Sequence, residues 1–211
     1  MEMKEQIEIL KERVYRSNLL LKQHNLVTLT WGNVSEIHRR SGLIAIKPSG
    51  VDYEKMKVED IVITDLDGNV KEGNLKPSSD LLTHIEIYKA FPTVNAVVHT
   101  HSRWATIFSQ AGMDIPMLGT THADTFYGDI PCTRKMTDAE IAGDYEKETG
   151  KVVLNQVTDF SPQHFRGDKQ PSYHRASVWE CLPYRFAFYH HNGIIVHSNS
   201  KRQNFKCSFR A

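Results

Sequence analysis

The sequence predicts an α/β fold in which helices and strands alternate through about residue 151. Three observations support this prediction. Segments with the three- and four-residue apolar spacing of helices alternate with short apolar segments typical of strands. The length of 211 residues suits one ordinary globular domain. Hydrophobic residues make up 40% of the chain and charged residues 24%, which resembles soluble proteins rather than disordered or collagen-like chains.

The first third of the chain reads as one helix followed by a meander of strands. Apolar residues recur at helical spacing over residues 4–23, which predicts an amphipathic helix. Strands are expected over residues 26–31, 43–47 and 61–64, because these segments are rich in β-formers and are separated by glycine, proline and asparagine. A turn after the third strand leads to a further extended segment at Val70.

The middle of the chain continues the alternation. A helix is expected from Asp80, as its N-cap, to about Ala90, with Pro92 stopping it. A short buried strand is expected over 96–99 and a helix over 102–110. A threonine followed three residues later by a glutamate, at 137–140, fits a capping box that opens another helix.

The last sixty residues differ in kind from the rest. Residues 152–211 carry eight Lys and Arg against three Asp and Glu, a net charge of +5, whereas residues 1–151 carry −4. They show no sustained helical period, and only 185–189 and 193–197 read as strands. We therefore divide the chain into a core, 1–151, and an atypical tail, 152–211. A reading-frame shift near codon 152 would explain the change; the alternative is a divergent C-terminal segment that still folds against the core.

Charge and composition exclude several functional classes. The formal net charge is +1, and a nucleic-acid-binding protein usually has a strong basic excess, so no nucleic-acid partner is expected. No stretch approaches the roughly 18 to 20 apolar residues of a membrane span, and residues 1–13 are charged throughout. We expect a cytoplasmic protein without a membrane partner. The three cysteines are widely spaced, which favours reduced thiols over a disulfide framework or a metal knuckle.

The sharpest local motif is a pair of histidines, His99 and His101, on the strand expected near residue 98. Side chains at i and i+2 of a strand point to one face, so two imidazoles would lie side by side, as Zn²⁺ or a similar divalent ion requires. The alternative is two ordinary histidines, each hydrogen-bonded separately.

Two similar turns could bind an anion. Ser78, Ser79 and Asp80 lie at the start of a predicted helix, where hydroxyls and free N–H groups suit a phosphate. The alternative there is plain capping by Ser79 or Asp80. The other turn contains Lys47, Ser49 and Gly50, where an ammonium group is present and a glycine lets the backbone approach a ligand; by itself such a segment is usually an ordinary turn.

Two further segments carry candidate functional groups. Asp124 follows a loop of polar, titratable residues and could act as a general acid or base; an Asx turn or a cap is the alternative. Trp31, Gly32 and Asn33 offer an aromatic wall, a flexible glycine and an amide near a strand end, and a packing role is at least as plausible.

Five motifs in order closely resemble the class II aldolase/adducin-like family. The motifs are LVTLTWGNVS (26–35), IKPSGV (46–51), KPSSD (76–80), VHTHS (98–102) and GTTHAD (119–124). With IPCTRKMT at 130–137, the resemblance is closest to the bacterial L-ribulose-5-phosphate 4-epimerase branch, and it covers about residues 1–151.

The resemblance implies a three-layer α/β/α domain around a mostly antiparallel sheet, usually a homotetramer with active sites between protomers. It implies a divalent metal, normally zinc, held by His99 and His101, with Asp80 close to or on it, and a role for Asp124 in proton transfer. Phosphate and sugar contacts are implied at Gly32, Asn33, Lys47, Ser49, Gly50, Ser78 and Ser79.

The implied reaction interconverts L-ribulose 5-phosphate and D-xylulose 5-phosphate by breaking and remaking the C3–C4 bond. Asp80 in place of a glutamate favours the epimerase over a fuculose or rhamnulose phosphate aldolase, as does the TTHAD segment. The family's third metal histidine and its C-terminal tyrosine are not recognisable in the tail, so a non-catalytic or adducin-like chain is the other alternative. The tail histidines that could substitute are His164, His174, His190, His191 and His197.

Overall fold

The computed structural model describes residues 2–123, 129–157, 185–190 and 193–198. Seven strands form one sheet in the order β4-β3-β2-β1-β5-β7-β6, and every neighbouring pair is antiparallel. The strands are β1 (Asn33–His38), β2 (Leu43–Ile46), β3 (Val62–Thr64), β4 (Val70–Glu72), β5 (Ala96–Thr100), β6 (Arg185–His190) and β7 (Gly193–Ser198). The helices are α1 (Met3–Gln23), η1 (Val58–Asp60), α2 (Leu81–Ala90), α3 (Arg103–Ala111), α4 (Thr120–Ala123), α5 (Asp138–Ala142) and α6 (Tyr145–Val157).

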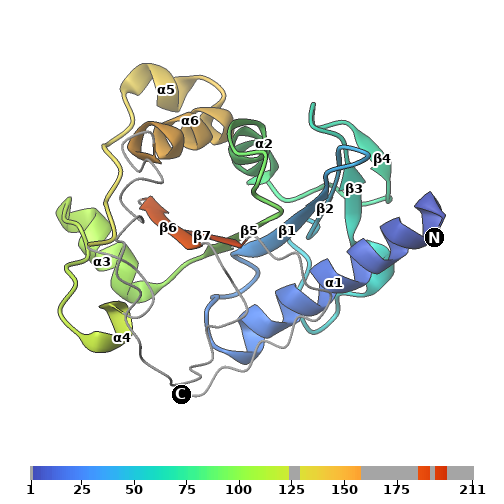
Figure 1. Ribbon diagram of the computed structural model, residues 1–211, viewed down its shortest axis with the longest axis horizontal. Helices are drawn as coiled ribbons and strands as arrows, with labels where there is room; N and C mark the ends of the chain where they lie inside the picture. The colour runs from blue at the N-terminus through green and yellow to red at the C-terminus, as the bar shows by residue number, and fades with distance from the viewer. Residues whose placement is uncertain (1, 124–128, 158–184, 191–192, 199–211) are drawn as a thin grey trace, which may run out of the picture.

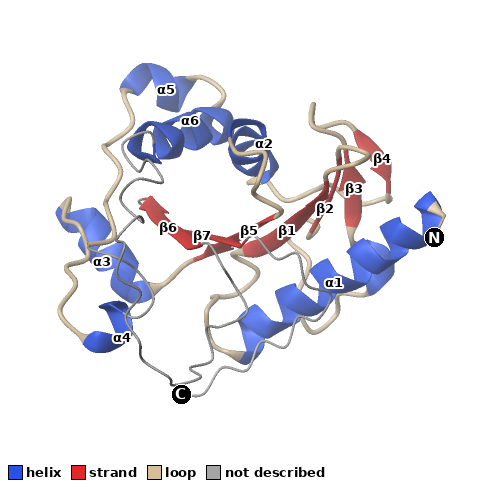
Figure 2. Ribbon diagram, viewed as in Figure 1, coloured by secondary structure: helices blue, strands red, loops and turns tan. Residues whose placement is uncertain are grey.

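The sheet lies between two helical layers, as Figures 1 and 2 show: α1 covers one face, and α2 with α5 and α6 lies over the other. Strand alternation produces these layers, because successive side chains point to opposite faces. In β2, Ile44 and Ile46 pack into the core beneath α2, whereas Ala45 packs with the apolar side of α1. The predicted three-layer fold with a mostly antiparallel sheet is confirmed.

One predicted strand is wrong. Residues 26–31 do not form a strand: a turn lies at 29–30, and the strand begins only at Asn33. Leu29 has a positive φ of 54° and the Trp31 amide donates to the Thr28 carbonyl at 3.0 Å, so the segment curls back on itself. The preference of these residues for strands is overridden because the chain must turn from the end of α1 into the sheet.

A buried amide fixes where β1 meets α1. The side chain of Asn18, which is fully buried in α1, accepts from the Val34 amide at 2.9 Å and donates to the Val34 carbonyl at 3.1 Å. This pair of hydrogen bonds holds the start of β1 against the helix. The next residue toward the N-terminus, Asn33, belongs to the site.

Most other predicted elements are confirmed, including the capping box in which Thr137 and Glu140 bind each other's backbone at the start of α5. Helix α6 was not predicted; it contains residue 151 and continues to Val157. Gly150 in its centre weakens the helical signal. In the structure Gly150 allows a close approach, because a Cβ there would lie 2.8 Å from the Glu86 Cβ in α2.

The two strands predicted in the tail are also present. Strand β7 borders β5 and places Ile195 opposite His99 and His197 opposite Val97, and β6 forms the sheet edge beyond it. None of the helices in the described part of the chain is long and apolar enough to cross a membrane.

Candidate functional site

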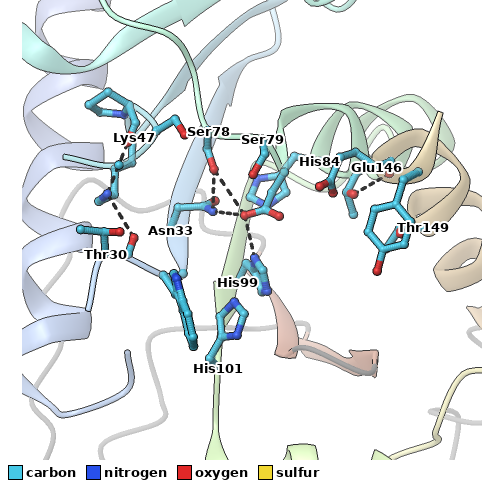
Figure 3. Close-up of a pocket in the computed structure, with 18 residues that line it drawn as sticks. Thr30, Asn33, Lys47, Ser78, Ser79, His84, His99, His101, Glu146 and Thr149 are labelled. Carbon is cyan, nitrogen blue, oxygen red and sulfur yellow. Dashed lines mark hydrogen bonds and ion pairs between the residues drawn. The ribbon is translucent and has the colours of Figure 1, made fainter. Parts of the chain in front are cut away.

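A pocket of about 560 Å³ opens where β1 and β5 meet the first turns of α2 and α6. Eleven residues singled out from the sequence line it, as Figure 3 shows for most of them: Trp31, Gly32, Asn33, Lys47, Ser49, Gly50, Ser78, Ser79, Asp80, His99 and His101. Asp124, the remaining one, lies outside the described residues. Segments distant in sequence therefore bring hydroxyl, amide, carboxylate and imidazole groups into one cavity.

Asp80 is at the centre of this arrangement. It occupies the N-cap position of α2, as predicted, but its side chain makes no capping hydrogen bond. Its Oδ2 instead accepts from Asn33 Nδ2 at 2.5 Å, from His99 Nδ1 at 2.9 Å and from Ser78 Oγ at 3.3 Å. The interpretation that the Asp80 side chain caps the helix is wrong, because its Oδ2 instead accepts from donors in β1, β5 and the preceding turn.

These donors also set the ionisation of Asp80. Burial, the largest single influence, raises the pKa of the carboxyl, but the hydrogen bond and charge of His99, the charge of His84 and the hydrogen bond from Asn33 together bring it well below its usual range. Asp80 is therefore a carboxylate at neutral pH.

The two histidines lie as the i, i+2 spacing predicts. The ring centroids of His99 and His101 are 4.8 Å apart. His99 uses Nδ1 toward Asp80, so with Nδ1–H as donor its Nε2 lone pair remains for a ligand; carboxylates orient metal-binding histidines in this way. Burial and the neighbouring His99 lower the pKa of His101 to about 4, which keeps this ring neutral, the form that binds metals.

These donors suit a divalent ion, but the described part of the chain does not complete a site. It contains no group of three or more His, Cys, Asp and Glu side chains arranged to hold a metal. Strand β7 borders β5 and brings Ile195, not a histidine, to the position opposite His99.

Lys47 is buried, and its ammonium group donates hydrogen bonds to backbone carbonyls around the pocket. Its Nζ donates to the carbonyls of Val51 at 2.8 Å, Pro48 at 3.3 Å and Thr30 at 3.4 Å, and lies 4.7 Å from the centre of the Tyr53 ring. Burial lowers its pKa to about 8, although nearby carboxylates oppose this. Lys47 thus contributes positive charge to the pocket while holding its turn in place (Figure 3).

The two candidate anion-binding turns are fastened to each other. The Ser49 amide donates to the Lys76 carbonyl at 2.9 Å, and the Ser78 amide donates to the Lys47 carbonyl at 3.0 Å. These bonds flank a bridge between Pro48 and Pro77. Serines from both turns therefore face one pocket from a fixed backbone frame.

Sequence reasoning missed several pocket residues on helices. His84 is fully buried at the pocket, with Nδ1 2.7 Å from Ser35 Oγ, and Ser35 also lies 2.7 Å from the Tyr88 hydroxyl. His84 follows Asp80 by four residues, a one-turn spacing that could have indicated a shared face. The residues missed on α2 and α6 are Thr83, His84, Tyr145, Glu146 and Thr149.

The missed residues of α6 had no such signal, because the helix itself was not predicted. Thr83 Oγ1 donates to the Glu146 carbonyl at 2.6 Å, which ties α6 to α2 beside the pocket. Burial and the nearby charge of Asp80 raise the pKa of the Glu146 carboxyl. This side chain therefore takes up a proton more readily than an exposed glutamate.

A comparison with known protein families identifies the family of the chain. Residues 12–157 match the family described as the class II aldolase and adducin N-terminal domain. The chain belongs to this family. The matched range includes the eleven candidate residues that line the pocket, and also Asp124, which lies outside the described residues.

Named relatives and solved structures agree with this membership. The chain is 54% identical over 158 residues to "L-ribulose-5-phosphate 4-epimerase UlaF" of Salmonella paratyphi B and of Salmonella typhi, covering 75% of this chain and 69% of each relative. The structure resembles an L-fuculose 1-phosphate aldolase, with a TM-score of 0.67, 24% identity and coverage of 90% of this chain and 76% of that one. It also resembles the L-fuculose-1-phosphate aldolase of Thermus thermophilus, with a TM-score of 0.63, 20% identity and coverage of 92% and 82%. At these identities the two solved structures show a shared fold.

Proposed function

We propose that the chain is an L-ribulose-5-phosphate 4-epimerase, which interconverts L-ribulose 5-phosphate and D-xylulose 5-phosphate. The 54% identity to relatives of that name carries the proposal. The pocket supports it, because the reaction needs groups that stabilise negative charge on the sugar and groups that hold a phosphate. His99, His101 and Asp80 offer the former, and the two serine-containing turns offer the latter.

The phosphate would bind between the two turns. Ser78 and Ser79 precede the ten-residue helix α2, whose first N–H groups and dipole favour an anion. Ser49 and Gly50 face the same cavity from the other turn, and Lys47 adds positive charge behind them. Gly32 and Asn33 complete this wall, and we propose sugar contacts there.

Members of this family use a divalent metal ion, and we propose zinc, although another divalent ion would suit the same donors. His99 and His101 would hold it, with Asp80 orienting His99 through Nδ1. When bound, such an ion acts as a Lewis acid that stabilises negative charge on substrate oxygens. If residues 152–211 are the genuine C-terminus, the third histidine would be one of the five named above.

Proton transfer is the remaining requirement, because the C4 hydroxyl must lose a proton when the C3–C4 bond breaks and regain one when it re-forms. We propose Asp124 for one of these transfers, since the GTTHAD motif that carries it resembles the family's own. Asp124→Asn would remove the proton acceptor with little change in side-chain size, and it should lower kcat by about 10²-fold or more. A variant with unchanged kcat would contradict this role.

An assay of both products tests the proposal. The zinc-loaded chain is incubated with L-ribulose 5-phosphate, and D-xylulose 5-phosphate and free glycolaldehyde phosphate are measured in parallel. The epimerase should form the first with little of the second, and His101→Asn should abolish turnover. Free aldehyde as the main product would favour a class II sugar-phosphate aldolase.

A defective or adducin-like, non-catalytic chain is the other outcome, since the described part of the chain lacks a complete set of metal ligands. It would show weak zinc binding and neither product. Stoichiometric zinc together with measurable epimerisation would exclude it.

We propose a homo-oligomer as the assembly, a tetramer if the C-terminus is intact. Exposed apolar side chains on and after α3 support association: Trp104 is 72% exposed, Ile107 50% and Leu118 87%. Light scattering coupled to gel filtration should give four times the 24.2 kDa chain mass, and a monomer would contradict the proposal. The cytoplasmic location stays a prediction, which cell fractionation would test.

A further inference from the structure

Trp31 combines exposure with a position in the pocket. Its side chain lines the cavity, yet the residue remains 53% exposed. The indole lies beside His101, with ring centroids 5.4 Å apart and planes tilted by 44°. A half-exposed indole that lines a pocket offers a ligand a large apolar surface. None of the roles proposed so far uses this side chain.

The backbone that carries Trp31 is held from several sides. The Tyr53 hydroxyl lies 3.1 Å from the Trp31 carbonyl and 2.7 Å from the Gly32 carbonyl, and Lys47 Nζ binds the preceding carbonyl of Thr30. Gly32 has φ +81°, and a Cβ there would lie 2.9 Å from the His99 carbonyl. The indole is therefore presented to the pocket mouth by a fixed turn.

The reaction proposed above requires that an aldehyde fragment stay in the pocket between bond cleavage and bond formation. A base takes the C4 hydroxyl proton, C4–O becomes an aldehyde carbonyl, and the electron pair of the C3–C4 bond passes into the C1–C3 fragment as an enediolate. In epimerisation the aldehyde turns its other face, the C3–C4 bond re-forms and the proton returns to the C4 oxygen. If the aldehyde escapes, C3 takes a proton from water, and dihydroxyacetone and glycolaldehyde phosphate are released.

We propose that Trp31 is a specificity-determining residue whose indole closes the pocket beside His101 and retains the two-carbon aldehyde fragment until the bond re-forms. This inference rests on the proposed function and extends it. An indole face excludes water and contacts C–H groups, but it offers the aldehyde oxygen no hydrogen bond on that face. The fragment can therefore rotate against it while the two serine-containing turns hold its phosphate.

The test compares partition between the two outcomes in Trp31→Ala, Trp31→Phe and a matched control. Leu29→Ala is the control, because Leu29 is an apolar residue of the same turn, 69% exposed, that does not line the pocket. The ratio of released glycolaldehyde phosphate to D-xylulose 5-phosphate should rise at least tenfold in Trp31→Ala and less in Trp31→Phe. Leu29→Ala should retain the wild-type ratio. A purely structural role would lower both products together, and an unchanged ratio in Trp31→Ala overturns the inference.

A binding measurement separates this inference from the proposed function. Glycolaldehyde phosphate is titrated into the zinc-loaded chain, with heat and tryptophan fluorescence recorded together. Binding should change the fluorescence of the wild type and of Leu29→Ala, and much less that of Trp31→Phe. If Trp31→Phe binds the aldehyde and shows the same fluorescence change as the wild type, the role of Trp31 is overturned, whereas the proposed function stands. A wild-type chain that neither binds the aldehyde nor forms D-xylulose 5-phosphate overturns the proposed function, and this inference with it.

Discussion

At the scale of single residues, Gly32 is the glycine whose lack of a side chain matters most to the site. Its φ is +81°, and a Cβ would lie 2.6 Å from Val27 Cγ1 and 2.9 Å from the His99 carbonyl. Gly32→Ala should lower the free energy of unfolding by about 2 to 4 kcal/mol, the sum of backbone strain and overpacking. Gly50→Ala is the control, with φ +69° but open space around it, and should cost only about 1 kcal/mol. Equal losses in urea denaturation would contradict the close contact.

The burial of His84 predicts a loss of stability in mild acid. Burial lowers its pKa to about 3, whereas an unfolded histidine titrates near 6.5. Below about pH 6.5 the unfolded chain therefore binds a proton that the folded chain does not, and the free energy of unfolding falls as pH falls. This one group should account for about 2 kcal/mol between pH 7 and pH 5.

Urea denaturation at both pH values, with a chelator present, measures this loss. His84→Gln removes the titrating ring, so its stability should fall less between pH 7 and pH 5. Part of the fall should remain, because His101, with a pKa near 4, contributes in the same direction. A variant with the full wild-type pH dependence would show that His84 is not the group responsible.

Most residues of the candidate pocket could be predicted from sequence motifs. His99 and His101 follow from strand periodicity alone, since two residues of one strand share a face. His84 was missed because a histidine among apolar helix residues reads as an ordinary core residue. The Nδ1 contact between His99 and Asp80 joins groups 19 residues apart, so only the fold reveals it.

At the scale of elements, the close packing of α6 on α2 determines one side of the pocket. Gly150 is the point of contact, since a Cβ there would lie 2.8 Å from Glu86 Cβ and 3.2 Å from Thr83 Cα. Gly150→Leu should lower the free energy of unfolding by about 2 kcal/mol or more, despite the better helix propensity of leucine. Lys147→Leu, on the exposed side of the same helix, should change it by less than about 0.5 kcal/mol. Thermal or urea unfolding of both variants measures the difference.

Elements were predictable where local chemistry decides them. The Thr137–Glu140 capping box and the helix at Asp80 depend on neighbours within a few residues, and both helices begin where expected. The strand expected at 26–31 failed because contacts with α1 and the Gly32 turn override local preference. Helix α6 is polar and contains Gly150, and its stability comes from packing on α2 rather than from its own sequence.

At the scale of the whole molecule, the change of character in the tail predicts a lesion in the coding sequence. The family match ends at residue 157, and residues 152–211 carry a charge of +5 against −4 for the rest. Sequencing the DNA from codon 145 past codon 211 and translating all three frames tests this. Another frame should restore the family's third metal histidine and its C-terminal tyrosine.

If no frame restores them, the tail is a divergent segment. The third metal ligand must then be sought among its histidines, by zinc titration of single His→Ala variants. The register of β7 places His197 opposite Val97 and Ile195 opposite His99. The sheet order of the tail could not be read from the sequence, since strand pairing across the chain depends on long-range register.

The bridge between Pro48 and Pro77 also determines which part of the molecule is free to vary. It closes the chain from residue 49 to residue 76 into a loop whose two ends are tied together at the pocket. Beyond Tyr53, which supports the Trp31 turn, this loop runs through β3 and β4 and returns without lining the cavity. Extra residues next to Asp67, an exposed residue of the turn between β3 and β4, would lengthen a loop whose ends are already tied together, at small entropic cost. Evolution can therefore lengthen or decorate that hairpin, for example to contact another protein, while the two turns keep their spacing.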